Sequence, residues 1–135
     1  MITPPLKRLD IVIVDFGPLV ENSSVQCLVR PALVLQPTSM NNTSTTTIVC
    51  PLTKVRKKLF LPYHCEVSQK YGLKYDSIAL IEQTTVIDQS SIIKRIGHID
   101  DDSEVARSIN RGLIRTLGIH ECESSAPAPT KGGGV

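Results

Sequence analysis

Two short apolar segments, residues 30–36 and 45–52, constrain most what this chain can fold into. The first begins with Arg30-Pro31, and the second is a β-branched run that ends at Thr53. Runs of this length and composition are typical of β-strands. Pro31 keeps Arg30 out of the α region and cannot donate to a sheet, so we expect Arg30 at the start of its strand.

Antiparallel pairing of these two segments brings the start of the first beside the end of the second. Arg30 and Thr53 then become neighbours in space. A fixed guanidinium next to a hydroxyl suits a phosphodiester, because the guanidinium can donate two parallel hydrogen bonds to phosphate oxygens. The pattern therefore predicts a candidate phosphodiester-binding site at Arg30 and Thr53.

Other short runs predict the rest of a mainly β domain. Loop 19–27 is longer than hairpin closure needs, and long loops are often functional. Asn41 and Asn42 are natural turn residues. The strand expected at 61–67 is a candidate partner of 45–52. Further strands are expected at 9–16, 78–81 and 86–88, with a brief helix at 90–96.

The last periodic segment predicts a helix. Asp102 or Ser103 is a good N-cap, and Gly118 fits the position just past the end. Apolar residues recur at intervals of four, which marks one helical face. They are Val105, Ile109, Leu113 and Leu117. A row of arginines on another face is expected to be solvated: Arg107, Arg111 and Arg115.

Together these elements predict one domain over residues 1–120. We expect it to be mainly β with a C-terminal helix, as a strongly curved antiparallel sheet or small SH3-like barrel with flanking helices. Residues 121–135 are rich in Ser, Ala, Pro and Gly, so they have little to bury and are expected to be disordered.

Composition limits the function classes. The formal net charge of +2 is too small to announce a nucleic-acid binder, so local patches must carry that argument. No run approaches a membrane helix and the N-terminus lacks the order of a signal peptide, so a cytoplasmic protein with no membrane association is expected. The four cysteines show no metal-binding spacing, and strand alternation sends His64 and Cys65 to opposite faces. We expect no metal and no cofactor.

A basic run follows Thr53 directly. It contains Lys54, Arg56 and Lys57. Such a run fits a solvated hairpin tip, and it also fits a positive field that attracts RNA to the same site as Arg30. The two interpretations are compatible.

Several sequence landmarks occur in a specific order. They are Asp-Ile-Val-Ile-Val-Asp-Phe-Gly-Pro at 10–18, Val-Arg-Pro-Ala-Leu-Val-Leu at 29–35, Ile-Val-Cys-Pro-Leu-Thr at 48–53, Leu-Pro-Tyr-His-Cys-Glu-Val at 61–67 and Ile-Glu-Gln at 81–83. In this order and spacing the chain resembles the MazF/PemK family, the toxin ribonucleases of bacterial toxin–antitoxin pairs. The resemblance covers about residues 9–119.

The resemblance implies a homodimer of barrels with CcdB-like topology that cleaves single-stranded RNA at short sequences without a metal. It implies an antitoxin protein as the inhibitor. The arginine of the Arg-Pro element and the threonine that ends the following strand are the usual catalytic residues of the family, and they correspond here to Arg30 and Thr53. Glu82 is a candidate acid–base residue or, alternatively, a structural residue held in a salt bridge, and Gln83 is a candidate supporting residue beside it. The candidate RNA contacts in polar loops are Ser23, Gln26 and Asn42.

The chain also departs from the family pattern. Loop 19–27 is longer than usual and lacks glycine, so the RNA sequence that relatives recognise does not transfer. Leu9 replaces a common glycine, and Thr85 stands where many relatives have arginine. Two alternatives stay open. One is a CcdB-like binder that poisons gyrase, although this chain lacks the tryptophan typical of that class. The other is a family member that binds RNA or antitoxin without cutting.

Overall fold

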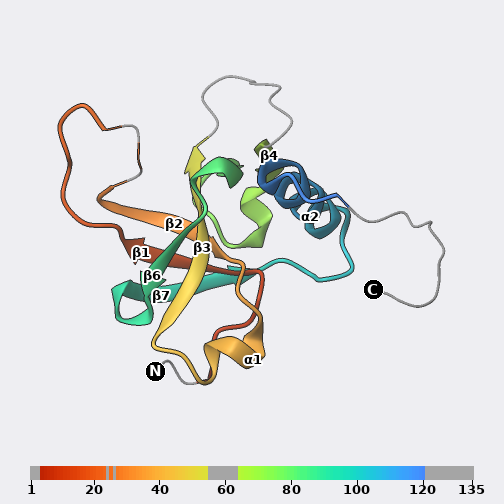
Figure 1. Ribbon diagram of the computed structural model, residues 1–135, viewed down its shortest axis with the longest axis horizontal. Helices are drawn as coiled ribbons and strands as arrows, with labels where there is room; N and C mark the ends of the chain where they lie inside the picture. The colour runs from red at the N-terminus through yellow and green to blue at the C-terminus, as the bar shows by residue number, and fades with distance from the viewer. Residues whose placement is uncertain (1–3, 24, 26, 55–63, 121–135) are drawn as a thin grey trace, which may run out of the picture.

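Most of the chain forms one antiparallel β-sheet with a long helix packed on it (Figure 1). The computed structural model describes residues 4–23, 25, 27–54 and 64–120. The strands are β1 (Asp10–Asp15), β2 (Val29–Val34), β3 (Thr46–Lys54), β4 (His64–Val67), β5 (Ser77–Leu80), β6 (Thr85–Asp88) and β7 (Ile92–His98). The helices are α1 (Thr38–Asn41) and α2 (Glu104–Leu117), with single 3-10 turns η1 (Gln69–Tyr71), η2 (Ile81–Gln83) and η3 (Gln89–Ser91).

β3 is the central strand, and it pairs with β2, β5 and β6. The sheet order is β4-β5-β3-β2-β1-β7, with β6 beside β3 off this path. The expected pairing of the 61–67 strand with β3 is wrong, because β4 pairs with β5, the next strand in the chain. Residues 61–63 of that expected strand lie outside the described residues, as does the expected tail at 121–135.

The mainly β architecture with a C-terminal helix is confirmed, but the sheet is not a closed barrel. Within the described residues, the strands at the two ends of the order, β4 and β7, are not hydrogen-bonded to each other. A closer link exists between the ends of this order. Gly72, in the turn between β4 and β5, lies against Gly97 in β7, and a Cβ on either glycine would overlap the backbone carbonyl of Ile96 or Tyr71. The sheet is therefore curved enough for its ends to meet through backbone contact.

The helix expected at 90–96 is wrong. Residues 89–91 form the short turn η3, and β7 follows as a strand beside β1. Ile92 and Ile93 are β-branched and favour a strand, and pairing with β1 satisfies the backbone groups that a short helix would leave unpaired. The strand predicted at 78–81 is also one residue too long, because Ile81 already belongs to η2.

Alternating strand residues divide the core into two layers. Leu33, Cys50, Leu52, Cys65 and Ala79 lie in a cluster that α2 covers through Ile109. Their neighbours along the strands lie in a second cluster on the other face of the sheet. That cluster contains Leu6, Val12, Val14, Ala32, Val34 and Val49. Because side chains alternate between faces, the position of each strand residue relative to these layers is fixed.

The caps predicted for the last helix are confirmed. The Ser103 hydroxyl accepts a hydrogen bond from the Ala106 amide at 3.1 Å, and Gly118 ends α2 with a φ of +67°. The apolar face is shorter than predicted, since Leu117 is 64% exposed. None of the helices in the described part of the chain has the length and apolarity to cross a membrane.

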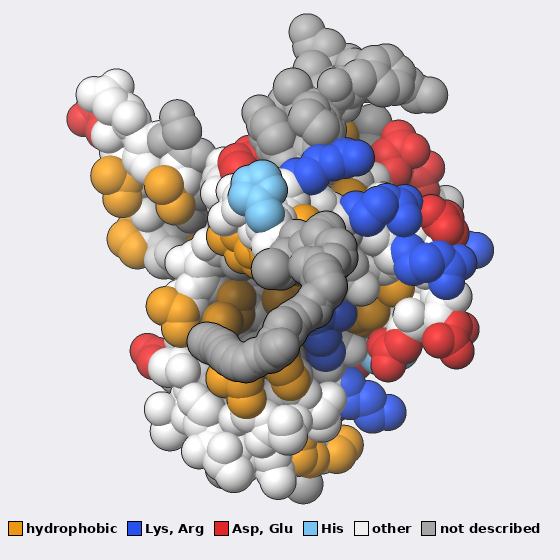
Figure 2. All heavy atoms as spheres, turned by 45° about the vertical axis from the view of Figure 1, so that its right-hand side comes forward, with side chains coloured by type: hydrophobic (Ala, Val, Ile, Leu, Met, Phe, Trp, Pro, Cys, Tyr) orange, Lys and Arg blue, Asp and Glu red, His pale blue; other side chains and the backbone are white. Residues whose placement is uncertain are grey.

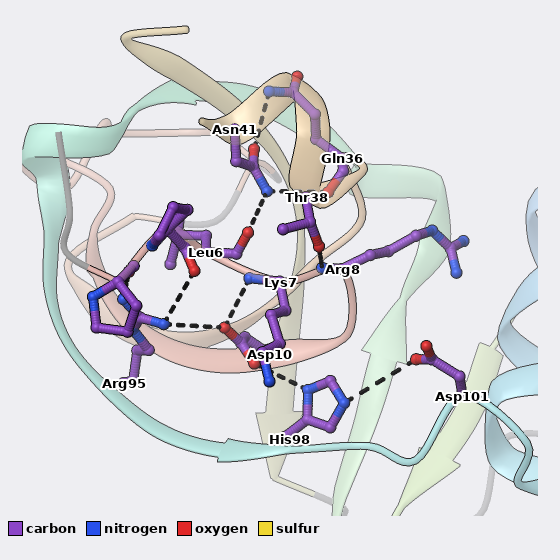
Figure 3. Close-up of polar contacts among 12 residues, drawn as sticks. Leu6, Lys7, Arg8, Asp10, Gln36, Thr38, Asn41, Arg95, His98 and Asp101 are labelled. Carbon is purple, nitrogen blue, oxygen red and sulfur yellow. Dashed lines mark hydrogen bonds and ion pairs between the residues drawn. The ribbon is translucent and has the colours of Figure 1, made fainter. Parts of the chain in front are cut away.

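Two buried polar residues tie the N-terminal segment to the sheet (Figure 3). The Asp10 carboxylate accepts hydrogen bonds from the Lys7 amide at 2.9 Å and from Nδ1 of His98 at 2.8 Å, and it lies 3.5 Å from the Arg95 guanidinium. Asn41, predicted as a turn residue, is instead the buried last residue of α1. Its amide donates to the carbonyl of Leu6 at 3.1 Å.

Candidate active site

The register of β2 and β3 brings Arg30 and Thr53 toward one another. Ala32 lies opposite Pro51, and Leu33 lies opposite Cys50. The ladder ends at Ala32 and Pro51, so Arg30 and Thr53 each lie two residues beyond the last pair, at the neighbouring ends of the two strands. Both side chains are half-buried.

Arg30 and Thr53 also share a face. Each lies two residues from a paired position, Ala32 and Pro51, and alternation puts all four on the side of the sheet away from α2. Arg30 and Thr53 therefore lie on one face of the sheet, and their joint contact with a substrate stays a prediction.

The base of loop 19–27 holds the Arg30 side chain. Its Nε donates to the carbonyl of Cys27 at 3.2 Å, which orients the guanidinium plane. Leu28 takes a left-handed backbone conformation, with a φ of +65°. The Leu28 amide donates to the Gly17 carbonyl at 2.6 Å, and its carbonyl accepts from the Phe16 amide at 2.9 Å. These bonds close the loop, so Arg30 extends from an ordered strand start.

Lys54 points to the opposite face from Thr53, because successive strand residues alternate. Its ammonium lies 4.2 Å from the centre of the Tyr75 ring, and the ammonium of Lys74 lies 5.7 Å from the same ring. Lys54 is therefore next to Thr53 in the chain, but its side chain lies on the other face of β3.

Glu82 is the acidic group of this region. It lies in η2, and both of its carboxylate oxygens approach Nε2 of His64, at 3.2 and 3.3 Å. Its neighbour Gln83 is half-buried in the same turn. Thr84 fixes the end of this turn, since its hydroxyl donates to the carbonyl of Ile81 at 2.7 Å.

The pKa of the buried Cys50 thiol, in β3, is affected by groups near the candidate site. Burial raises the pKa of Cys50 far above its usual range, and a hydrogen bond with Thr84 lowers it by less. The negative charge of Glu82 also raises the Cys50 pKa, although it is the smallest of the causes. Glu82 is therefore close enough to β3 for its charge to be felt there, three residues before Thr53.

The residues expected to contact RNA lie in different parts of the structure. Ser23 is exposed in loop 19–27, where its hydroxyl accepts from the Val25 amide at 3.1 Å. Asn42 is exposed at the C-terminal cap of α1, four residues before the start of β3, whereas Thr53 is the next-to-last residue of that strand. Gln26, Arg56 and Lys57 lie outside the described residues.

Sequence analysis missed one side chain of this face. His64 was considered only as a metal ligand, next to Cys65. The useful signal was the same alternation that excluded the metal site, since a residue that faces away from the Cys65 core faces the side of Thr53. Among the described residues, no group of three or more His, Cys, Asp or Glu side chains is placed to hold a metal ion.

Comparison with known proteins gives relatives of one kind. The chain is 40% identical over 98 residues to endoribonuclease EndoA of Bacillus subtilis, which covers 72% of this chain and 83% of that protein. It is 28% identical over 120 residues to endoribonuclease MazF of Staphylococcus saprophyticus, covering 88% and 97%.

Solved structures agree on the fold. One neighbour is a mycobacterial endoribonuclease in complex with its cognate antitoxin, with a TM-score of 0.69 at 15% identity, covering 86% of this chain and 98% of that one. The family model described as PemK-like, MazF-like toxin of type II toxin–antitoxin system matches residues 7–117. The chain therefore belongs to the PemK-like, MazF-like family of type II toxin–antitoxin toxins.

Proposed function

We propose that this protein is the toxin of a type II toxin–antitoxin pair and that it cleaves single-stranded RNA without a metal ion. The observation that carries the proposal is the shared face of Arg30 and Thr53 on adjacent strands, in a chain of this family. Two relatives bear the name endoribonuclease. These similarities favour RNA cleavage over the alternative of gyrase binding.

The proposed step is attack of a ribose 2′-oxygen on the neighbouring phosphorus. The new O2′–P bond forms as the P–O5′ bond breaks, which leaves a 2′,3′-cyclic phosphate and a 5′-hydroxyl. The proton of the 2′-hydroxyl passes to Glu82, and the departing 5′-oxygen takes a proton from solvent. Duplex DNA is excluded as a substrate, because the reacting 2′-hydroxyl is absent from it.

The chain's own residues divide the remaining work. Arg30 stabilises the charge that grows on the phosphorane oxygens, and removal of one such preorganised donor typically costs about 10²–10³ in rate. Thr53 is too weak an acid to act as the base, so it donates a hydrogen bond to a phosphoryl oxygen. Gln83 supports Glu82 from the same turn.

RNA binding is assigned to the surfaces around this pair. Ser23 and Lys54 are the described contacts, and Gln26, Arg56 and Lys57 belong to the two segments next to them in the chain. Asn42 has weaker support, since it lies beside the opposite end of β3.

A homodimer is proposed as the assembled form. A hollow of about 390 Å³ opens between the end of β1 and β6. Exposed apolar side chains lie around it, including Val25 at 69% and Val86 at 62% exposure. A second copy of the chain would remove this surface from water. Elution as a stable monomer at micromolar concentration would contradict this part of the proposal.

The remaining partner is an antitoxin, the second protein of such a pair, and the proposed compartment is the cytoplasm. We propose that a flexible antitoxin segment lies across the loops beside Arg30 and displaces RNA. Added antitoxin should then abolish cleavage and RNA binding together.

Cleavage of a single-stranded transcript in EDTA tests the function. The wild-type chain should cut it and leave 2′,3′-cyclic phosphate ends, whereas Arg30→Ala should be at least a hundredfold slower. Arg95→Ala is the matched control, because that arginine contacts Asp10 and the carbonyls of Pro4 and Pro5. RNA with a 2′-methoxy group at the cut position should resist cleavage. Binding without cleavage by the wild type would instead identify a non-cutting family member.

A further inference from the structure

A histidine–carboxylate pair lies on the same face as Arg30 and Thr53. Nε2 of His64 is 3.2 Å from one oxygen of Glu82 and 3.3 Å from the other. The side chain of His64 is only 8% exposed, whereas that of Glu82 is 38% exposed. The carboxylate is therefore open to a substrate, and the imidazole is held behind it.

The strand registers place His64 on this face. Cys65 lies opposite Ala79, and Ala79 lies opposite Leu52; all three belong to the core under α2. The residues one step along these strands, His64 and Thr53, consequently point to the other side of the sheet. His64 and Thr53 are separated across the sheet by β5 alone.

The bond between the two groups has a fixed direction. A carboxylate can only accept, so Nε2 of His64 carries the proton and donates. A free glutamate side chain has several rotatable bonds, and holding it in one arrangement costs conformational entropy. A buried donor on β4 restrains Glu82 before RNA binds, so that this ordering is already in place.

We propose that His64 is a positioning residue that aims the Glu82 carboxylate at the 2′-hydroxyl of the RNA. This inference rests on the proposed ribonuclease function and assigns no new step to it. The 2′-hydroxyl proton still passes to Glu82, O2′ bonds to phosphorus, and the 5′-oxygen leaves with a proton from solvent. His64 touches neither the RNA nor the reacting atoms.

The chemistry of the site requires such help. A guanidinium has no acceptor for a proton and a threonine hydroxyl is a poor base, so neither Arg30 nor Thr53 is suited to remove the proton of the 2′-hydroxyl. A base works only within hydrogen-bond distance of the proton that it removes, and a displacement of about 1 Å can cost a factor of about 10². The group that holds Glu82 should therefore affect the rate of the chemical step and leave RNA affinity unchanged.

Four variants of the full chain test this inference by single-turnover cleavage of an RNA that the wild type cuts. His64→Leu removes the donor, and we expect its rate constant to fall about 10- to 100-fold. His64→Gln carries an amide nitrogen near the position of Nε2 and should recover most of that loss. Glu82→Gln should lose at least as much, and adding His64→Leu to it should cause no further loss, because the two residues act as one unit.

Binding and folding are measured beside the rate. RNA affinity, measured by fluorescence anisotropy in the Arg30→Ala background to prevent cutting, should stay within twofold for each variant. His98→Leu is the matched control, since His98 pairs with Asp10 outside the site, and it should cleave at the wild-type rate. If His64→Leu does not fold, His64→Asn replaces it, because the shorter amide ends before the position of Nε2.

Each outcome decides the inference. A wild-type rate constant for His64→Leu, a loss that adds fully to that of Glu82→Gln, or an equal loss in His98→Leu would overturn the positioning role while RNA cleavage by the wild type stands. Absence of cleavage by the wild type would overturn the proposed function instead.

Discussion

The chain contains two histidine–carboxylate pairs that are built in opposite ways. In the first, His64 is buried at 8% exposure and Glu82 is open at 38%. In the second, Asp10 is buried at 7% and His98 is open at 40%. The pair with the exposed carboxylate shares a face with Arg30 and Thr53. The pair with the buried carboxylate ties the N-terminal segment to β7.

The comparison shows how burial decides whether a carboxylate is accessible to a substrate. Asp10 receives a backbone amide, an imidazole and a guanidinium, so its acceptor positions are used inside the protein (Figure 3). With 7% of its side chain exposed, this carboxylate is closed to a substrate. Glu82 keeps part of its surface free, and only its histidine is enclosed. The same two functional groups therefore form an anchor in one place and a candidate base in the other.

The largest expected effect on stability comes from removing the Asp10 carboxylate, which anchors the N-terminal segment. Asp10→Ala should lower the free energy of unfolding by about 3–5 kcal/mol, because it strands Arg95 and His98 without their buried partner. Glu82→Ala should lower it by less, about 1–3 kcal/mol, because the exposed carboxylate costs little to remove but Nε2 of the buried His64 loses this acceptor. Urea unfolding followed by circular dichroism measures both. Equal losses in the two variants would remove the distinction between anchor and site.

The second effect uses one strained backbone position in each region. Leu9, beside Asp10, has a φ of +76°, and Leu28, before Arg30, has a φ of +65°. Such a conformation costs a leucine about 1–3 kcal/mol, and glycine avoids that cost. Leu9 is 1% exposed, so Leu9→Gly also removes core packing worth about 2–5 kcal/mol and should destabilise the protein.

Leu28→Gly should have the opposite sign. Leu28 is 45% exposed, so little packing is lost, and relief of strain should raise the free energy of unfolding by about 0.5–1 kcal/mol after the flexibility of an unfolded glycine is counted. Paired urea curves of Leu9→Gly and Leu28→Gly provide the measurement. A shift of the same sign in both variants would show that strain does not set the balance.

The third effect concerns the buried thiol of Cys50 in β3. Burial raises the pKa of the Cys50 thiol above its value in the unfolded chain. Stability from this group is complete below the unfolded pKa and is lost as pH rises above about 9, at up to about 1.4 kcal/mol per pH unit. Cys50→Ala should flatten the alkaline side of a stability–pH curve, and Cys27→Ala should leave that side as it is in the wild type.

The smallest effect lies on α2. Hydrogen bonds from Arg111 and Arg107 lower the pKa of Glu104, so any stability from this group is lost as pH falls. Acidic and basic side chains alternate on the face shown in Figure 2, where solvent screens them. The melting temperature of Glu104→Gln should stay within about 1 °C of the wild type. A larger drop would mean that surface pairs rival the anchor at Asp10.

Sequence patterns predicted the parts of the fold that depend on local rules. Strand alternation around 30–36 and 45–52 and the caps Ser103 and Gly118 follow from short-range sterics and hydrogen bonding, and the structure confirms them. Residues 90–96 were misassigned because a strand there is stabilised by pairing with β1, about eighty positions earlier in the chain. Such long-range pairing leaves little trace in local composition.

The candidate site shows the same limit. Arg30 and Thr53 were reached from sequence because a single strand pairing relates them, and their catalytic roles remain predictions. His64 required knowledge that β4 pairs with β5 and that β5 pairs with β3. Two successive registers had to be known before His64 could be placed on the same face of the sheet as Thr53.

The contact between Gly72 and Gly97 affects where the sheet can open. It joins the two ends of the strand order by van der Waals contact, where a barrel would have a hydrogen-bonded ladder. The contact between Gly72 and Gly97 can therefore open without breaking hydrogen bonds between strands. We expect local opening to be most frequent at this contact. Backbone amides next to Gly72 and Gly97 should exchange with heavy water before those of β2 and β3.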